Sequence, residues 1–493
     1  MKLKSKFLKW STGVPTAMLN KKTAEKIGIH SKDRISIRTY SRYPKEMSML
    51  VDTVEGIVRP GEIAVSLEIK KRMELRKEQP VDVNLSTIPQ STFYIKDKLD
   101  GKKLSPDQIK EIVKDIVNNS LSQAELSLFV SSMYVRGMDF KETIALINAI
   151  LDSGNLLKLG KKVIVDKHSV GGVPGNRTTP IVVSICAAAG LTMPKTSSRS
   201  ITSAAGTADV IETIARVEFT IDELKKIIKK TNACMVWGGA LGMVPADSKI
   251  LSTEKVLKID PEAQLLASIM SKKLAVGSEY ILIDIPYGKY AKVSKRKALN
   301  LKKKFERLGK YFKKDIKVVL TKGNQPIGNG IGPALELMDI LNILTPGKEG
   351  PKDLEEKSLF LAGELLEMTE KAKKGKGIEM AKEILKSGKA LKKFEEIIKA
   401  QEGDFSKIKF AQFKKDILSE KSGKVKDIHN KKINVAARFA GCPVDKSAGL
   451  YLYHKLGDKV EKGEKLITIY AESKSRLNSA INFFHKSKPI RIR

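Results

Sequence analysis

The stretch 166–180, DKHSVGGVPGNRTTP, concentrates groups that can hold a phosphate. Lys167 supplies a positive charge, and the pair of glycines that ends at Gly172 lets backbone N–H groups approach an anion closely. Ser169 and Thr178 can donate hydroxyl hydrogen bonds. The GxxxxGK[ST] order of a Walker loop is absent. A phosphate-binding loop and a glycine-rich turn without a ligand are therefore the two interpretations of this stretch.

A second stretch, 197–212, SSRSITSAAGTADVIE, is rich in hydroxyl groups and contains one arginine. Hydroxyl clusters also cap helices and satisfy turns, so this stretch alone does not establish a binding site. However, it follows the first stretch by about 30 residues. Two anion-type loops at this spacing favour a site for a phosphate-bearing ligand.

Strand-to-helix connections must position both loops. KKVIVDKH is typical of a strand, and TTPIVVSICAAAG is typical of a buried helix. Ligands of α/β proteins bind at the carboxyl ends of the strands, and a helix N-terminus there favours negative charge. Further strand patterns (ACMVWGG, EYILIDIP, KVVLTKG) alternate with helical ones (GTADVIETIA, IDELKKIIKKT). This alternation predicts an α/β domain with a mostly parallel sheet over residues 161–420, including a return of the chain to the helical domain.

The rest of the chain predicts three other domains. RISIRTY and EIAVSLEI alternate at the strand period within residues 1–85, which predicts a double-psi-like β-barrel. The stretch TIPQSTFYIKDKLDG is predicted to be a linker. Caps at Ser105, Ser122 and Asp139 predict three helices in a bundle within residues 86–160. Residues 421–493 predict a C-terminal α+β domain, because GDKVEKGEKLITIYA resembles the hammerhead of biotinyl and lipoyl domains, without the expected flanks around Lys474.

Composition limits the class of protein. The chain has 493 residues with 91 Lys and Arg against 56 Asp and Glu, a net charge of +35, which raises a nucleic-acid-binding alternative. The lysines are spread over nearly every predicted helix, without an aromatic-basic ribbon, which favours a general surface bias. Three distant cysteines and five histidines without ligand spacing disfavour disulfides and a metal site. The absence of a long apolar window or a signal peptide predicts a cytoplasmic protein that does not bind membranes.

KHSVGG, SSRSITSAAGTADVIE, ASIMSKK and NQPIGNGIG together resemble the thymidine/pyrimidine-nucleoside phosphorylase family. Their order and spacing match from about residue 100 to the C-terminus, roughly four-fifths of the chain. The extra N-terminal domain and the loop residues are similar to the archaeal branch of the family, which acts on AMP. The resemblance implies that inorganic phosphate attacks the anomeric carbon and the base leaves, with no metal or organic cofactor. For AMP, the products that the resemblance implies are free base and ribose 1,5-bisphosphate. CMP and UMP are implied as further substrates.

The resemblance also assigns residues. The attacking phosphate would be held by Lys167, Ser169, Thr178 and Ser197. AMP would be bound by Gly172, Ser198, Arg199, Ser200, Ile201, Thr202, Ser203, Thr207, Ser268 and Lys292. Asp260 would be the catalytic residue that protonates the leaving base, which requires a raised pKa, although Asp-Pro-Glu is also a standard helix start. The resemblance leaves the roles of His168 and Lys272 open.

The chain departs from the nucleoside phosphorylases in two places. Their second loop resembles SGRGLGHTGGT, and three of its glycines are here Ser198, Ser200 and Thr202. Added hydroxyls fit a second phosphate group, which a nucleoside monophosphate carries. The pyrimidine enzymes also have an arginine before the SIMSKK helix, where this chain has Thr253 and Glu254. Both changes favour AMP over thymidine.

Three alternatives stay open at this stage: a pyrimidine-nucleoside phosphorylase, a basic nucleic-acid-binding protein, and a phosphoribosyltransferase. The last would need an acidic metal cluster, which the loops lack. The resemblance implies that the helical domain forms a homodimer, that the barrel builds a larger homo-oligomer, and that the helical and sheet domains flank the cleft.

Overall fold

The computed structural model describes residues 1–8, 15–160, 163–200 and 203–493. Ile201 and Thr202, two of the predicted AMP-binding residues, lie outside the described residues. The chain divides into two compact units, Met1–Gly154 with Val244–Ser271 and Asn155–Met243 with Lys272–Arg493.

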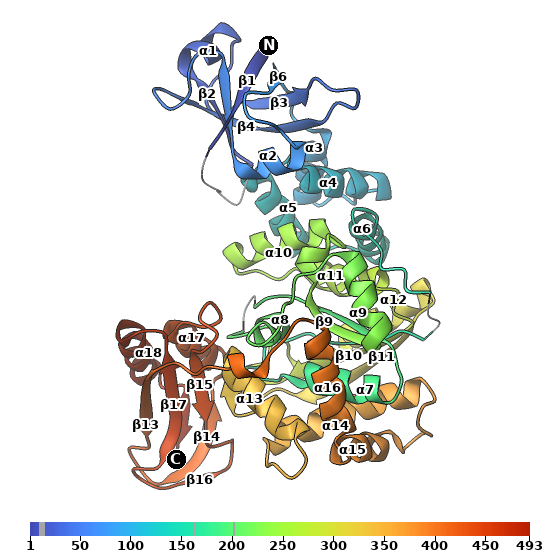
Figure 1. Ribbon diagram of the computed structural model, residues 1–493, viewed down its shortest axis with the longest axis vertical. Coiled ribbons are helices and arrows are strands. Elements are labelled where there is room, and N and C mark those ends of the chain that lie inside the picture. Colours follow the sequence, from blue (N-terminus) through green and yellow to red (C-terminus); the bar gives the residue numbers. More distant parts are fainter. Residues whose placement is uncertain (9–14, 161–162, 201–202) are drawn as a thin grey trace. The chain divides into compact units, whose positions relative to one another are not determined.

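The first unit begins with a closed barrel whose strand order is β1-β5-β2-β4-β3-β6 (Figure 1). Alternate residues such as Ile35 and Ile37 point into its core and are fully buried. The predicted N-terminal barrel is therefore present. Its elements are β1 (Lys2–Phe7), β2 (Ala17–Asn20), α1 (Lys21–Lys26), β3 (Arg34–Thr39), β4 (Glu46–Val54), β5 (Glu62–Val65), α2 (Leu67–Met73) and β6 (Pro80–Leu85).

Helices make up the rest of this unit. Ser105, Ser122 and Asp139 each accept a hydrogen bond from a backbone N–H three residues later and form complete capping boxes, as predicted. The predicted linker was wrong, because residues 90–99 form helix α3, which packs against α5 and buries Ile95. The helices are α3 (Gln90–Leu99), α4 (Pro106–Asn118), α5 (Gln123–Arg136), α6 (Phe140–Asp152), α10 (Pro245–Leu257) and the first part of α11 (Glu262–Ala275).

The second unit contains a parallel sheet covered by helices, as predicted. β7 pairs with β10 and β10 with β11, while β8 pairs with β9, all in parallel, and a bridge from Ile164 to Thr192 links the two groups. The strands are β7 (Val165–Ser169), β8 (Met193–Ser197), β9 (Ala233–Trp237), β10 (Tyr280–Tyr287) and β11 (Asp315–Lys322). The helices are α7 (Thr178–Ala188), α8 (Thr207–Ile211), α9 (Ile221–Thr231), α12 (Lys295–Phe312), α13 (Pro333–Leu344), α14 (Lys352–Met368), α15 (Gly377–Lys386) and α16 (Lys389–Ala400), with short 3-10 turns η1 (Gly238–Leu241) and η2 (Phe405–Lys407).

The last part of the second unit is an α+β domain. Its sheets have the orders β12-β15-β17-β13 and β16-β14-β18. Lys474 begins helix α18, so it is not at the tip of a hairpin as an acceptor lysine would be. The elements are β12 (Gly330–Ile331), β13 (Phe413–Leu418), β14 (Gly423–Ile428), α17 (Asn430–Ala440), β15 (Gly449–Leu452), β16 (Lys459–Val460), β17 (Lys465–Ala471), α18 (Lys474–Ser487) and β18 (Ile490–Ile492).

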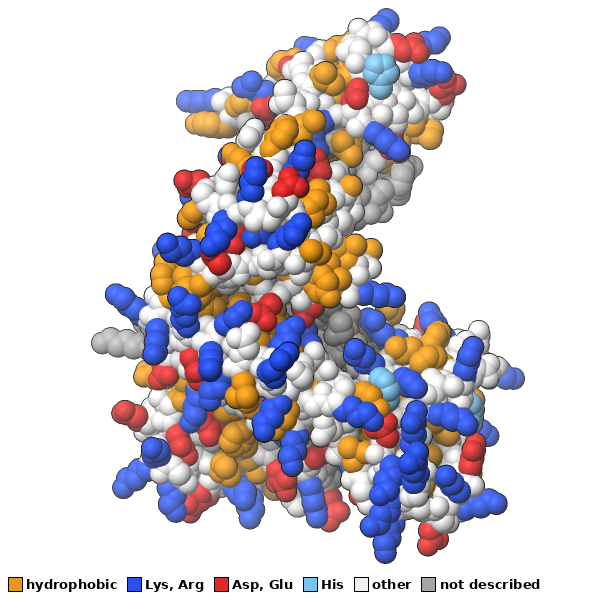
Figure 2. All heavy atoms as spheres, turned by 180° about the vertical axis from the view of Figure 1, so that it is seen from behind, with side chains coloured by type: hydrophobic (Ala, Val, Ile, Leu, Met, Phe, Trp, Pro, Cys, Tyr) orange, Lys and Arg blue, Asp and Glu red, His pale blue; other side chains and the backbone are white. Residues whose placement is uncertain are grey.

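The surface carries the basic charge broadly. Figure 2 shows Lys and Arg side chains over most of the visible face, interspersed with Asp, Glu and apolar groups. In the part of the chain that the structure describes, none of the helices has the length and apolar character needed to cross a membrane.

Candidate phosphate and nucleotide site

Lys167 is buried where strand β7 leads into helix α7. Only 1% of its surface is exposed. Its Nζ donates to Thr178 Oγ1 at 2.6 Å, and Thr179 Oγ1 lies 3.5 Å away. Burial lowers the pKa of Lys167 to about 7, with further lowering by Lys357 and Lys195, while Asp284 opposes the change. The first stretch therefore places a buried, titratable amine at the start of a helix.

Side chains alternate along a strand, so Asp166 points to the opposite face of β7 from its neighbour Lys167. On that face it meets two other lysines. Lys195 Nζ is 3.1 Å from Asp166 Oδ1, and Lys273 Nζ is 2.6 Å from Oδ2. All three side chains are at least 95% buried. Burial alone would raise the pKa of Asp166, but the two lysines hold it below its usual value.

The negative charge of Asp284 on β10 offsets the positive charge of Lys167 on the neighbouring strand β7. Lys357 Nζ lies 2.9 Å from Asp284 Oδ2, and Thr321 donates to Oδ1 at 2.6 Å. Burial alone would raise the pKa of Asp284, but the charges of Lys357 and Lys167 lower it.

These residues form a buried lysine cluster, defined as Lys167, Lys195, Lys273 and Lys357 with Asp166 and Asp284. Fully charged, it would contain four positive groups against two negative ones. Uncompensated buried charge costs several kcal/mol per ion. Proton loss relieves part of that imbalance, because burial lowers the pKa of Lys167 and of Lys273 to about 7. A phosphate bound beside Lys167 would instead favour the charged form of that amine.

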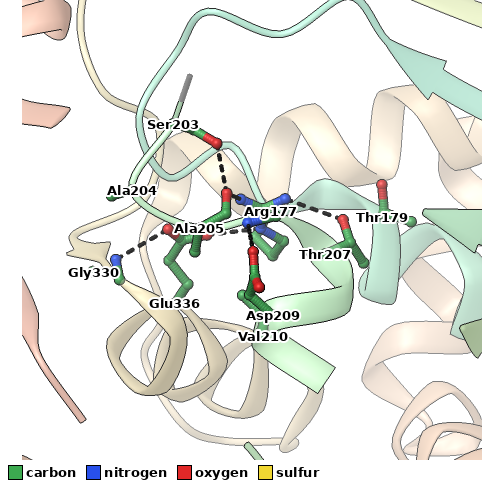
Figure 3. Close-up of polar contacts among 12 residues, drawn as sticks. Arg177, Thr179, Ser203, Ala204, Ala205, Thr207, Asp209, Val210, Gly330 and Glu336 are labelled. Carbon is green, nitrogen blue, oxygen red and sulfur yellow. Dashed lines mark hydrogen bonds and ion pairs between the residues drawn. The ribbon is translucent and has the colours of Figure 1, made fainter. Parts of the chain in front are cut away.

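Arg177 joins the two loops that the sequence singled out (Figure 3). Its Nη1 donates to Thr207 Oγ1 at 3.0 Å and its Nη2 to the carbonyl oxygen of Ala205 at 2.7 Å. Its Nε donates to Glu336 Oε2 at 2.7 Å. Burial raises the pKa of Glu336 to about 7, although the Arg177 charge opposes this. The end of the second loop is therefore held against the start of α7.

Two described residues of the second loop converge on Asp209. The backbone N–H groups of Ser200 and Gly206 both donate to Asp209 Oδ2 at 2.7 Å. A Cβ at Gly206 would lie 2.6 Å from the Ser198 carbonyl oxygen, so a larger residue would displace the turn.

The hydroxyl groups of this turn have different surroundings. Ser203 Oγ donates to the Ala205 carbonyl at 2.7 Å, and Ser200 Oγ donates to the Ser203 carbonyl. Ser198 is exposed. Ser197 Oγ, among the described atoms, is buried without a hydrogen-bond partner in the protein, so it is able to bond a ligand.

Arg199 is turned toward carboxylates. Its Nη2 lies 2.7 Å from Glu212 Oε1 and 2.8 Å from Glu218 Oε1. Its guanidinium lies over the Trp237 ring, 4.7 Å from the centroid. These contacts hold the turn to its surroundings, and the assignment of Arg199 to AMP stays a prediction.

Gly172 and Lys292 come together from distant parts of the sequence. Gly172 has φ +89°, and a Cβ there would lie 2.7 Å from both Cβ and N of Lys292. Only glycine fits this approach and this backbone conformation. Ser169 Oγ, in the same loop, is 3.5 Å from Asn176 Nδ2.

Comparisons with known proteins give matches to three parts of the chain and to full-length relatives. Residues 161–391 match the description "Glycosyl transferase family, a/b domain", residues 93–154 match the helical bundle domain of that family, and residues 424–491 match "Pyrimidine nucleoside phosphorylase C-terminal domain". The chain is 45% identical to AMP phosphorylase of Pyrococcus furiosus, over 100% of this chain and 98% of the relative. It is 44% identical to that of Thermococcus kodakarensis, with the same coverage, and 42% identical to that of Methanococcus aeolicus, over 99% and 97%.

The chain belongs to the AMP phosphorylase family. This confirms the family and the archaeal branch predicted from four motifs. A solved structure of anthranilate phosphoribosyltransferase from Thermus thermophilus is similar with a TM-score of 0.52, over 62% of this chain and 99% of that one. At 17% identity it shows a shared fold alone.

The remaining predicted residues of this AMP phosphorylase family member have other surroundings. Asp260 is half-buried just before helix α11, and Ser268 on that helix is 6% exposed. Both belong to the first unit, whereas the loops belong to the second. Their roles toward AMP therefore stay predictions. Burial and the charges of four lysines, Lys273 first, lower the pKa of His168 well below its usual value, so this imidazole is neutral at pH 7.

Sequence reasoning missed most of the buried lysine cluster. Lys272 was considered, but its neighbour Lys273 is the one that is fully buried against Asp166. A signal existed: Asp284 interrupts the apolar strand run YILIDIP, and charged residues inside such runs are almost never buried unless paired. The partners could not be identified, because Asp166 and Lys273 are 107 positions apart.

Proposed function

We propose that the chain catalyses the phosphorolysis of AMP by inorganic phosphate to adenine and ribose 1,5-bisphosphate. The observation that carries this proposal is the identity of 40–45% to relatives named AMP phosphorylase over essentially the whole chain. The buried lysine cluster supports it, because a phosphate bound beside Lys167 would favour the charged form of that amine. CMP and UMP are proposed as further substrates.

Lys167, Ser169, Thr178 and Ser197 would hold the attacking phosphate. A phosphate oxygen forms a bond to C1′ of the ribose while the bond from C1′ to the base breaks. The leaving base takes up the electron pair and a proton, which Asp260 donates in this proposal. Fixing the two reactants relative to one another supplies much of the acceleration, because a bimolecular step becomes effectively unimolecular.

The second loop would bind the 5′-phosphate and ribose of AMP. Gly172 and Lys292 approach one another closely, which supports their assignment to one substrate. Ser198, Arg199, Ser200, Ser203, Thr207 and Ser268 complete the proposed set, together with Ile201 and Thr202.

The finer domain assignments are also proposals. We assign residues 1–85 to a double-psi-like barrel used in assembly, 86–160 to dimerisation, 161–420 to binding and 421–493 to a hammerhead-like domain. The chain would act in the cytoplasm as a homodimer or a larger homo-oligomer.

The test is incubation of the purified chain with AMP and phosphate, with and without EDTA, followed by measurement of free adenine. Thymidine, adenosine and AMP are compared at equal phosphate. We expect base release from AMP that depends on phosphate and survives EDTA. Release of thymine faster than adenine would replace the proposal by a pyrimidine-nucleoside phosphorylase, and no release from any of them would overturn it.

A further inference from the structure

Helix α17 of the C-terminal domain presents two asparagines to two different loops of the proposed AMP site. Asn430 and Asn434 are four residues apart, so they lie on one face of the helix, one turn from each other. Asn430 is fully buried and Asn434 is 7% exposed. Most buried polar side-chain atoms in folded proteins have hydrogen-bond partners.

Asn434 holds the second loop. Its Oδ1 accepts a hydrogen bond from the backbone N–H of Ala204 at 3.0 Å. Lys446, which follows α17 in the chain, places its Nζ 2.8 Å from Glu212 and 3.4 Å from Asp209. Asp209 is the carboxylate on which the loop's backbone N–H groups at Ser200 and Gly206 converge.

Asn430 and the residues just before α17 hold the loop that carries Lys292. Asn430 Nδ2 donates to the Tyr290 carbonyl in this loop at 3.5 Å, and to the Gly323 carbonyl just after β11 at 2.9 Å. The ring of Tyr290 stacks on His429 with centroids 3.9 Å apart and 18° between planes. Tyr290 Oη donates to Asp427 Oδ2 at 2.5 Å. Tyr290 is two residues before Lys292, so this clamp fixes the backbone that packs on Gly172.

We propose that α17 and its flanking residues are a positioning element, which holds the second loop and the Lys292 loop in one fixed arrangement and thereby sets the affinity for AMP. The inference rests on the proposed function. Its physical basis is that one helix and the residues next to it contact both loops, through Asn434 with Ala204 and through Asn430 and His429 with Tyr290. Its residues act through the loops and do not touch the reacting atoms.

Two variants remove one contact each. Asn434→Leu removes the acceptor for Ala204 N–H, and Tyr290→Phe removes the hydroxyl bonded to Asp427. We expect each to raise KM for AMP about tenfold while kcat and KM for phosphate change less than twofold. Lys431→Ala, an exposed position in the first turn of α17, is the matched control and should leave all three constants unchanged.

A structural readout separates positioning from general damage. Amide hydrogen exchange should become faster at Ala204 in Asn434→Leu and slower again in Asn434→Asp, which restores an accepting oxygen. The Lys292 loop should keep its wild-type exchange in both variants at position 434. Equal acceleration throughout the second unit would mean that α17 only supports the fold, which overturns the inference.

The outcomes for the two proposals differ. If the wild-type chain releases no adenine from AMP, the proposed function is wrong. If wild type is active but Tyr290→Phe and Asn434→Leu leave KM for AMP within twofold, the positioning role is wrong. Should Asn434→Leu fail to fold, Tyr290→Phe decides, because removing one hydroxyl keeps the stacked ring.

Discussion

At the level of single residues, the proposed role of Lys167 predicts that phosphate binding depends on pH. Its folded pKa of about 7 lies below the ordinary lysine value of 10.5 because the amine is buried. In the proposed role the charged form binds phosphate, so KM for phosphate should rise about tenfold between pH 6.5 and pH 8.5, measured at saturating AMP. Lys167→Met should raise this KM at pH 6.5 and flatten its pH dependence. Lys229→Met, at an exposed site on α9, is the control, and a wild-type KM independent of pH would contradict the role.

The same shift has a consequence for stability, with the opposite sign. Between about pH 7 and pH 10.5 the folded Lys167 binds fewer protons than the unfolded chain does. Its contribution to stability therefore rises with pH in this window and is lost as pH falls through 7. Bound phosphate reverses the balance by favouring the charged amine, so the rise in Tm that phosphate produces should be larger at pH 6.5 than at pH 8.5.

Asp260 carries the prediction about the leaving base. General acid catalysis typically contributes about 10²–10⁴-fold in rate. Asp260→Asn keeps the size and one side-chain oxygen but removes the proton donor. We expect kcat for AMP to fall by about this factor while KM changes less than threefold, as measured by adenine release. Glu262→Gln, two residues later in the first turn of α11, should retain wild-type kcat. A kcat within twofold of wild type in Asp260→Asn would exclude Asp260 as the donor.

At the level of elements, an ion pair between Lys357 and Asp284 links helix α14 to strand β10. Lys357 approaches Asp284, whose side chain is fully buried. Removing one partner of a buried pair costs roughly 3–5 kcal/mol, because the other charge stays buried. Lys357→Met should therefore lower Tm by several degrees, and Lys357→Met with Asp284→Asn should recover most of the loss. Lys352→Met, exposed on the same helix, should change little in calorimetry. No recovery in the double variant would show that packing, and not charge, is responsible.

Local signals explain which elements the sequence could predict. Ser105, Ser122 and Asp139 cap helices through contacts only three residues away, so the start of each helix was predictable. Helix α3 was taken for a linker because its defining contacts, such as Ser91 with Asp115, join residues 24 positions apart. Arg177 was missed for the same reason, since its partners in the second loop and α13 are 28–159 positions away.

At the level of the whole molecule, the net charge of +35 should act on the substrate before it binds. A positive surface raises the encounter rate of anions by about 10–10³-fold, and salt screens this attraction, whereas buried charges are screened much less. Raising NaCl from about 50 to 500 mM should therefore lower kcat/KM for AMP several-fold while kcat stays within twofold.

A nucleic-acid-binding protein would behave differently: it would bind single-stranded RNA tightly and with a steep salt dependence. We expect RNA, added at phosphate concentrations equal to AMP, to inhibit adenine release less than twofold at 150 mM NaCl. Strong inhibition there, together with an AMP kcat/KM that does not respond to salt, would mean that the surface charge serves a polyanion partner and not the substrate.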